Sequence, residues 1–321
     1  MMKACVLKDV KTFEVRDVPV PKLEDDEILL KVSACSICGS DPTMSGNAAY
    51  IGRIFGHELC GVVEDPNKSS FKAGDRLIMG TSSTRGCPGI RRDGGYAEYV
   101  AVEAAHMLPM PDNMSDRAGC MVEPLAIGYG SVLAANVKPG DKVLITGCGI
   151  IASMIAQWAK YMGASYIAMT EINDAKIARA KSIGTPAEFF KADEPDVIQK
   201  LMDASGGGFD ACFDCPGTQQ TIALCIEAAK PSSTIIEIAI HYTPVSFNYL
   251  KLVMKQLNFK GFYGSQPFFK DVIRILSEEK PFDPTMFISE EVDIDGIPQA
   301  IADLTAPGSD LLKIIIRKQE P

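Results

Sequence analysis

The stretch that decides the fold is "VLITGCGIIA", Val143–Ala152, where an apolar strand pattern runs directly into the spacing Gly147-x-Gly149-x-x-Ala152. Residues 137–184 around it read as strand, glycine turn, amphipathic helix, strand and helix, which predicts a βαβ unit. The first glycine permits a tight turn, the second lets a phosphate approach the backbone, and the alanine allows close packing of helix on strand. Alone, such a pattern could be an ordinary turn. In this setting it predicts a dinucleotide site with the pyrophosphate at the helix N-terminus.

An acidic residue follows at the place where such a site needs one. Glu171, in "IAMTEIN", ends the next strand, 19 residues past Ala152. A carboxylate there can accept hydrogen bonds from the adenosine ribose hydroxyls and would repel a 2′-phosphate. No arginine follows until Arg179. The pattern therefore favours NAD over NADP, the alternative being a solvated loop glutamate.

The rest of the chain shows two different sequence patterns. With 321 residues we expect two domains. Residues 1 to about 110 carry short alternating or apolar runs bounded by Gly, Pro, Asp and Asn, which predicts an all-β part. From residue 137 to about 264, strand and helix patterns alternate, which predicts a doubly wound parallel sheet. A helical stretch, "FKDVIRILSEEK", and a last strand, "LLKIIIRK", follow. The fold class is therefore α/β.

Composition excludes several partners. The net charge is −9 with a pI of about 5.0, and no long basic run occurs, so nucleic acid and anionic membranes would be repelled. No apolar h-region or uninterrupted run of about 18 apolar residues is present, which predicts a cytoplasmic protein without a membrane span. Ten scattered cysteines indicate reduced thiols rather than a disulfide framework. A small molecule is the expected partner.

A second motif indicates metal chemistry. "SACSICGSDPTMSGN", residues 33–47, and "GHELCG", residues 56–61, bring a cysteine, a histidine and a glutamate into one part of the chain. Taken singly, Cys35 and Cys38 could be small core residues and His57 a satisfied core histidine. With a nicotinamide cofactor expected, the donor types thiolate, imidazole and carboxylate suit a catalytic zinc ion that keeps an open position.

On several motifs in the same order, the sequence resembles the medium-chain zinc-dependent alcohol and polyol dehydrogenases over nearly its full length, and within them the sorbitol- and threonine-dehydrogenase-like branch. The matching pieces are "CGSD" (38–41), "GHE" (56–58), "AGDRL" (73–77), "DGGYAEY" (93–99), "EPLA" (123–126), "VLITGCGIIA" (143–152) and Glu171.

The resemblance implies a GroES-like β-rich catalytic domain, residues 1–127 and 263–321, and a Rossmann NAD-binding domain, residues 128–262. It implies interconversion of a secondary alcohol and its ketone with NAD, the substrate being a polyol, sugar alcohol or sugar acid, phosphorylated or not. A homodimer or homotetramer is expected.

The same resemblance assigns residues to roles. Cys38, His57 and Glu123 would be zinc ligands, and Glu58 would be the neighbouring acid that can approach the metal, so Glu58 or water completes the shell. Asp41 would orient a ligand, and Ser40 would take the proton of the substrate alcohol. The catalytic residues are thus Cys38, Ser40, His57 and Glu58; the metal residues are Cys38, His57, Glu58 and Glu123; the cofactor residues are Gly147, Gly149, Ile150, Ile151, Glu171 and Lys176.

The sequence also departs from that family. The interval that carries four cysteines for a structural zinc in classical members is here residues 78–93, with the single Cys87. We therefore expect one catalytic zinc and no structural zinc. Arg53, Arg91 and Arg92 could meet an anionic substrate group, or form solvated surface ion pairs. Two other functions stay open: a non-catalytic NAD-binding sensor, and a zinc-free NADPH-dependent quinone or enone reductase.

Overall fold

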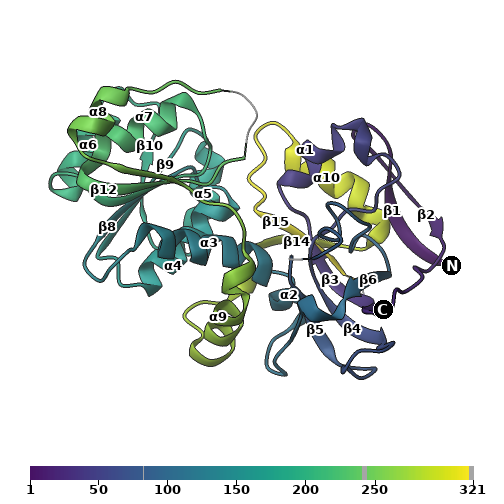
Figure 1. Cartoon of the computed structure of the whole chain (residues 1–321). Helices are drawn as coiled ribbons and strands as arrows, with labels where there is room; N and C mark the ends of the chain where they lie inside the picture. Colours follow the sequence, from purple (N-terminus) through teal and green to yellow (C-terminus); the bar gives the residue numbers. More distant parts are fainter. Residues whose placement is uncertain (82, 241–243, 318–321) are drawn as a thin grey trace. The chain divides into compact units, whose positions relative to one another are not determined.

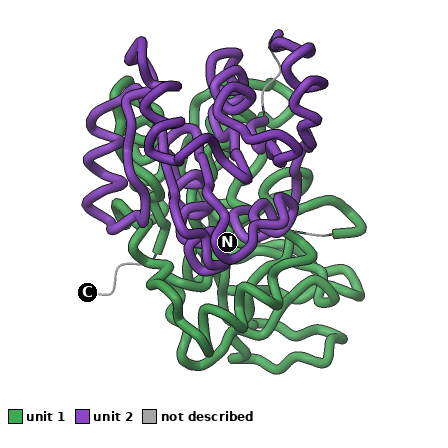
Figure 2. Tube along the Cα trace, turned by 90° about the vertical axis from the view of Figure 1, so that its left-hand side faces the viewer, with its two compact units in different colours: residues 1–126, 265–321 green, residues 127–264 purple. Residues whose placement is uncertain are grey.

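The computed structural model describes residues 1–81, 83–240 and 244–317. The chain forms two compact units, shown in Figures 1 and 2. The first consists of Met1–Ala126 and Ser265–Pro321, and the second of Ile127–Gly264. No helix in the described ranges is long and apolar enough to cross a membrane.

The second unit is built on a parallel sheet. Its strand order is β10-β9-β8-β11-β12-β13, and every pairing is parallel. The chain runs outward from β8 in one direction and then restarts at β11 in the other, so a topological switch point lies between these two strands. The strands are β8 (Lys142–Thr146), β9 (Tyr166–Glu171), β10 (Glu188–Lys191), β11 (Phe209–Asp214), β12 (Ala229–Glu237) and β13 (Asn258–Gly261).

Helices cover both faces of this sheet, and in Figure 1 α6, α7 and α8 lie above it and α4 below. This double cover explains the nearly continuous apolar runs of the strands. The buried residues of α4 include its tryptophan, Trp158, which contacts Tyr129 and Tyr161 edge to face. The helices of this part are α3 (Val122–Ala135), whose residues up to Ala126 belong to the first unit, α4 (Ile150–Tyr161), α5 (Asp174–Ser182), α6 (Val197–Ser205), α7 (Gln219–Ala228) and α8 (Tyr249–Met254).

The first unit is mainly antiparallel. β1 pairs with β2, and a seven-stranded sheet has the order β14-β15-β3-β4-β5-β7, with β6 paired to β3. Its strands are β1 (Met2–Asp9), β2 (Thr12–Val18), β3 (Glu27–Ser36), β4 (Glu58–Asp65), β5 (Arg76–Met79), β6 (Tyr99–Glu103), β7 (Met107–Pro109), β14 (Ile288–Val292) and β15 (Lys313–Arg317). Its helices include α1 (Ser40–Ser45), α2 (Asp116–Gly119), α9 (Phe269–Arg274) and α10 (Ile297–Thr305).

The strand register determines which residues lie next to the end of β3. Ser36 pairs with Glu58 of β4 on one side and with Ile315 of β15 on the other. Just before β4, Gly56 has φ +96°, and a Cβ there would lie 2.6 Å from the Tyr96 ring. Only glycine therefore lets the chain enter β4 at this place. The start of β4, the segment around Tyr96 and strand β15 thus lie near the end of β3, although they are far apart in sequence.

The sequence predicted these architectures. The β-rich part, the βαβ unit and the doubly wound parallel sheet are all present, so the expected α/β class is confirmed.

Candidate active site

The candidate metal donors meet because of the β3–β4 register. Cys38 lies two residues past Ser36, in the turn between β3 and α1, and His57 lies one residue before Glu58, the first residue of β4. Because Ser36 and Glu58 are paired, the end of β3 and the start of β4 are adjacent. The turn after one strand thus faces the loop before the next.

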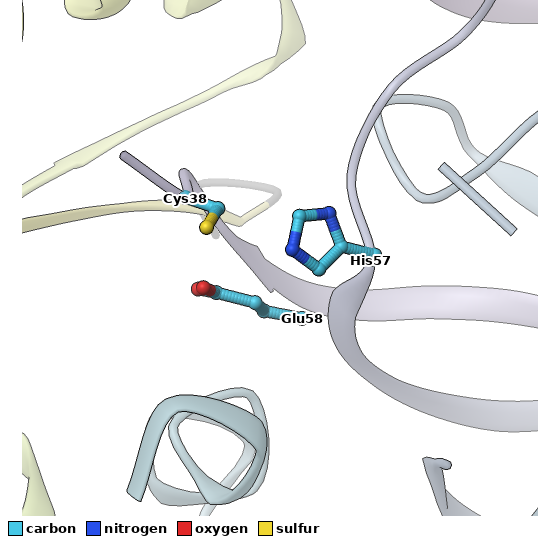
Figure 3. A group of neighbouring side chains, drawn as sticks. All are labelled: Cys38, His57 and Glu58. Atoms are coloured by element: carbon cyan, nitrogen blue, oxygen red, sulfur yellow. The ribbon is translucent and has the colours of Figure 1, made fainter. Parts of the chain in front are cut away.

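Figure 3 shows Cys38, His57 and Glu58 directed toward one another. One donor atom of each lies within 4.8 Å of the other two, and among the described residues no other group of three such side chains does so. His57 and Glu58 are buried, and Cys38 is partly buried. Ser40 Oγ donates a hydrogen bond to Cys38 Sγ at 3.1 Å. The structure thus brings four of the predicted residues together.

Glu58 has a partner that the sequence analysis missed. Lys313, the first residue of β15, lies with its Nζ 2.7 Å from Glu58 Oε1 and also donates to the other carboxylate oxygen. The Ser36 hydroxyl donates to Glu58 as well. Lys313 and Glu58 are each only 1% exposed. The signal in the sequence was a lysine at the head of the apolar run "KIIIR", because a charge buried in a strand needs a partner.

Asp41 supports the histidine and the cysteine turn. Its carboxylate accepts hydrogen bonds from the Cys38 backbone N–H at 3.0 Å and from the Tyr96 hydroxyl. Its Oδ1 lies 3.6 Å from His57 Nδ1, and neither of these two buried atoms makes a hydrogen bond within the protein. A carboxylate facing one ring nitrogen fixes the orientation of a ligand histidine and leaves the other nitrogen for a metal.

Glu123 lies beside this group but outside it. It is the second residue of α3, and its Oε1 accepts a hydrogen bond from Ser265 Oγ at 2.8 Å. Burial raises the pKa of the Glu123 carboxyl, and the charge of nearby Glu58 raises it further. An acid in this place needs a positive charge near it to ionise.

The charges of the site fit a zinc ion. Burial lowers the pKa of His57, but Cys38, Asp41 and Glu58 together hold it well above its ordinary value. Besides that imidazole, the described residues offer these buried acids one fixed positive charge, Lys313. Sulfur, imidazole and carboxylate are also the donor types of zinc sites. A divalent cation beside these donors would favour the ionised form of the buried Glu123 carboxyl, whose pKa burial raises.

The glycine turn lies in the second unit, between β8 and α4. Gly147 has φ +84°, and a Cβ there would lie 3.2 Å from Pro216. Gly149 caps α4, whose first residues are Ile150 and Ile151, and nothing lies within 4 Å of the space a Cβ would take there. The backbone at the start of α4 is therefore open to a ligand.

Glu171 contacts this turn directly. Its Oε2 accepts from the Cys148 backbone N–H at 3.0 Å, and its Oε1 accepts from the backbone N–H groups of Ile172 and Asn173. Lys176, on α5, is near enough to lower the pKa of the Cys148 thiol, although burial raises that pKa to about 12. The carboxylate is fixed beside the turn at the end of β9, where the sequence placed it.

A second acidic pair lies at the carboxyl ends of the same sheet, and the sequence analysis missed it. Asp214 ends β11 and Glu237 ends β12, and the two residues are paired in the sheet. Thr146 Oγ1 donates to Asp214 Oδ1 at 2.7 Å. Burial raises the pKa of Glu237 to about 7, and Asp214 contributes to that rise. The signal was an acid ending each of two apolar strands, "FDACFD" and "STIIE".

The three arginines of the sequence analysis take different places. Arg92 pairs with Glu27, with its other nitrogen 3.7 Å from Glu103. Arg91 is exposed, and Arg53 is partly buried in the segment that pairs with β1. For Arg92 the structure therefore shows the ion-pair alternative.

Together the fold and the site define a class: a dehydrogenase with a GroES-like β-rich unit that carries zinc-type donors and a Rossmann unit that carries a dinucleotide turn. A family model for the alcohol dehydrogenase GroES-like domain matches residues 24–112, and one for zinc-binding dehydrogenases matches residues 151–278. The chain belongs to the zinc-dependent medium-chain alcohol and polyol dehydrogenases. This membership supports a zinc ion and a nicotinamide cofactor.

Relatives of known activity are similar over most of their length. L-Threonine 3-dehydrogenase of Chromobacterium violaceum is 26% identical over 94% of this chain and 96% of its own. D-Xylulose reductase of Morganella morganii is 29% identical over 87% of this chain and 91% of its own. The crystal structure of 2R,3R-butanediol dehydrogenase from Bacillus subtilis superposes with a TM-score of 0.90 at 23% identity, covering 99% of this chain and 100% of that one. This last likeness concerns the fold.

Proposed function

We propose that this protein uses zinc and NAD to interconvert a secondary alcohol and its ketone, with a polyol, sugar alcohol or sugar acid, phosphorylated or not, as substrate. The observation that carries the proposal is the group Cys38, His57 and Glu58, whose donor atoms lie within 4.8 Å of one another. Relatives named as a threonine dehydrogenase and a xylulose reductase support this substrate class, because both names denote hydroxyl-bearing substrates or products.

We assign the catalytic role to residues 1–127 and 263–321 and NAD binding to residues 128–262. Cys38, His57 and Glu123 would hold the zinc ion, and Glu58 or water would complete its shell. Zinc supplies Lewis-acid chemistry, which lowers the pKa of an alcohol by analogy with water, whose pKa falls from about 15.7 to about 7. One zinc per chain is expected, since Cys87 is the only cysteine in residues 78–93.

The remaining site residues would hold protons and orient donors. The Ser40 hydroxyl, which donates to Cys38 Sγ at 3.1 Å, would turn to accept the proton that the alcohol loses and pass its own proton on to water or another hydroxyl. Asp41 fixes the ring of His57 through its Nδ1 side. Lys313 holds the carboxylate of Glu58 in place from the other side.

In the second unit, Gly147 and Gly149 would leave room for the pyrophosphate, and the backbone N–H groups of Ile150 and Ile151 would face it. Glu171 would accept hydrogen bonds from the ribose hydroxyls. Three backbone N–H groups already hold its carboxylate, so it is pre-oriented for that contact. Lys176 would assist at the same end of NAD.

The test is a panel of polyols, sugar alcohols and sugar acids, each screened with NAD and with NADP in zinc-loaded protein. We expect turnover with NAD that is lost on chelation and restored by zinc. Cys38→Ala should abolish it, whereas Cys35→Ala, a change to a buried cysteine that belongs to no ligand set, should retain it. Activity that survives chelation would contradict the proposal.

Two other outcomes would identify the alternatives. NAD binding without metal-dependent turnover of any substrate would indicate a sensor. Reduction of quinones or enones by NADPH in zinc-free protein would indicate a reductase that needs no metal. The buried donor group argues against both, because neither function requires three metal-type donors at one place.

A further inference from the structure

A separate hollow of about 400 Å³ lies in the first unit. Residues of β1, β2 and β6 line it, together with the segments before His57 and before Tyr96 and the chain that follows β2. Its lining includes none of Cys38, His57, Glu58 and Glu123. A volume of this order suits a small ligand. The proposed reaction gives this hollow no role.

The lining is strongly positive. It includes four cationic side chains, Arg16, Lys22, Arg53 and Arg92, and one acidic side chain, Asp93. The chain as a whole carries a net charge of −9. A concentration of positive charge in one hollow of an acidic protein creates a local potential that attracts anions.

Most of this charge is not neutralised by the protein. Arg16, Lys22 and Arg53 form no ion pair with any residue in the described part of the chain. Arg53 Nε is buried and has no hydrogen-bond partner. A buried guanidinium N–H without an acceptor is costly, which indicates that its acceptor comes from outside the chain.

The other two charged residues of the lining, Arg92 and Asp93, do not neutralise this positive charge. Arg92 is held by Glu27, and its buried Nη1, which makes no hydrogen bond, lies 3.7 Å from Glu103 Oε1. The Asp93 carboxylate already accepts from the Ile54 backbone N–H at 3.0 Å. Arg92 is therefore balanced by Glu27 and Glu103, and the one acid of the lining is occupied by the backbone, so the charges of Arg16, Lys22 and Arg53 remain uncompensated.

We propose that this hollow binds a small phosphate-bearing ligand. Arginine presents a planar fork of N–H donors that matches phosphate oxygens, and three arginines line one hollow. A nucleic acid is disfavoured because the rest of the surface is acidic. The ligand is therefore a free phosphate ion or a small organic phosphate, bound in a hollow whose lining includes none of the zinc donors.

The test is calorimetric titration of the full chain, with zinc and NAD present, by inorganic phosphate and separately by phenyl phosphate. Phenyl phosphate carries no alcohol group to oxidise. We expect saturable binding of at least one probe below about 10 mM. Tighter binding of phenyl phosphate would identify an organic phosphate as the ligand, and equal or tighter binding of inorganic phosphate would identify the free ion.

Charge-matched variants decide whether the hollow is the site. Arg53→Gln should weaken binding at least tenfold, whereas Arg91→Gln, an identical change at an exposed arginine outside the lining, should change it less than twofold. Arg16→Gln, an exposed position on β2, should weaken binding at least threefold and serves if Arg53→Gln fails to fold. Absence of binding by both probes, or equal losses in the Arg53 and Arg91 variants, would overturn the proposal.

Discussion

Replacing Lys313 by methionine tests the charge balance of the candidate active site. The Lys313 ammonium group donates to both oxygens of Glu58 and, at 2.9 Å, to the Ile37 carbonyl. Methionine has a similar length but no charge or donor, so it would leave a buried carboxylate and a carbonyl without their partner. Removing one member of a buried ion pair costs about 3–5 kcal/mol. That is a large share of the roughly 5–15 kcal/mol that stabilises a typical protein.

Urea unfolding of the zinc-free protein measures this loss. With a slope of about 2–3 kcal/mol per molar urea, the midpoint for the first unit should fall by about 1–2.5 M when followed by circular dichroism. Trp158, the only tryptophan of the chain, lies in the second unit and gives an internal reference. Its fluorescence transition should move much less than the dichroism transition.

Controls separate the ion pair from the loss of a lysine in general. Lys31→Met makes the same change at an exposed position of β3 and should shift the midpoint little. Zinc should recover part of the loss in Lys313→Met, because a bound cation gives Glu58 another positive partner. A zinc-free Lys313→Met protein within about 1 kcal/mol of the parent, the range of surface pairs, would refute this reasoning.

Three further predictions concern the metal, the cofactor and pH. Elemental analysis should find about one zinc per chain, and about two would disprove the prediction that the structural zinc site is missing. His57→Ala should lose metal and activity while its circular dichroism spectrum stays the same. Glu171→Gln should raise KM for NAD roughly tenfold and narrow the preference for NAD over NADP, with kcat little changed. If the variant kept the full preference for NAD, Glu171 would not be the residue that determines cofactor choice. Folding raises the pKa of Glu237 from its ordinary 4.5 to about 7, so its stabilising effect is present below pH 4.5 and lost as the pH rises through 7. Urea midpoints should accordingly fall between pH 4.5 and 7, and Glu237→Gln should flatten that fall; an unaltered slope would contradict it.

The parts of the fold that sequence could predict depend on local patterns. The strand, glycine turn and helix of residues 142–161 are contiguous, so periodicity and two glycines determine them. The position of Glu171 was also predictable, because the length of the βα unit determines where the next strand ends. The short strands of the first unit were predictable from their turn residues, although their pairing partners were not.

The active-site details that escaped prediction depend on distant pairing. Lys313 and Glu58 are 255 residues apart, and only the β3–β15 and β3–β4 registers bring them together. No local pattern encodes such a contact. The hydrogen bond between Ser265 and Glu123, 142 residues apart, is also non-local, although it joins helix α3 to a loop and not two strands. Residue types alone could suggest which side chains donate to a metal. The charge partners of those side chains could be identified only from the tertiary structure.

The pairing of β15 with β3 also has a consequence for synthesis on the ribosome. The first unit is interrupted by residues 127–264, so β15 does not exist when Cys38, His57 and Glu58 emerge. At about 5–20 residues per second, the 255 residues from Glu58 to Lys313 take roughly 13–50 s to translate. During that interval the nascent chain holds the acid of β4 without its lysine. We expect the end of β3, beyond its pairing with β6, to stay an open sheet edge in this period, which makes the newly made chain most vulnerable to aggregation before β15 appears.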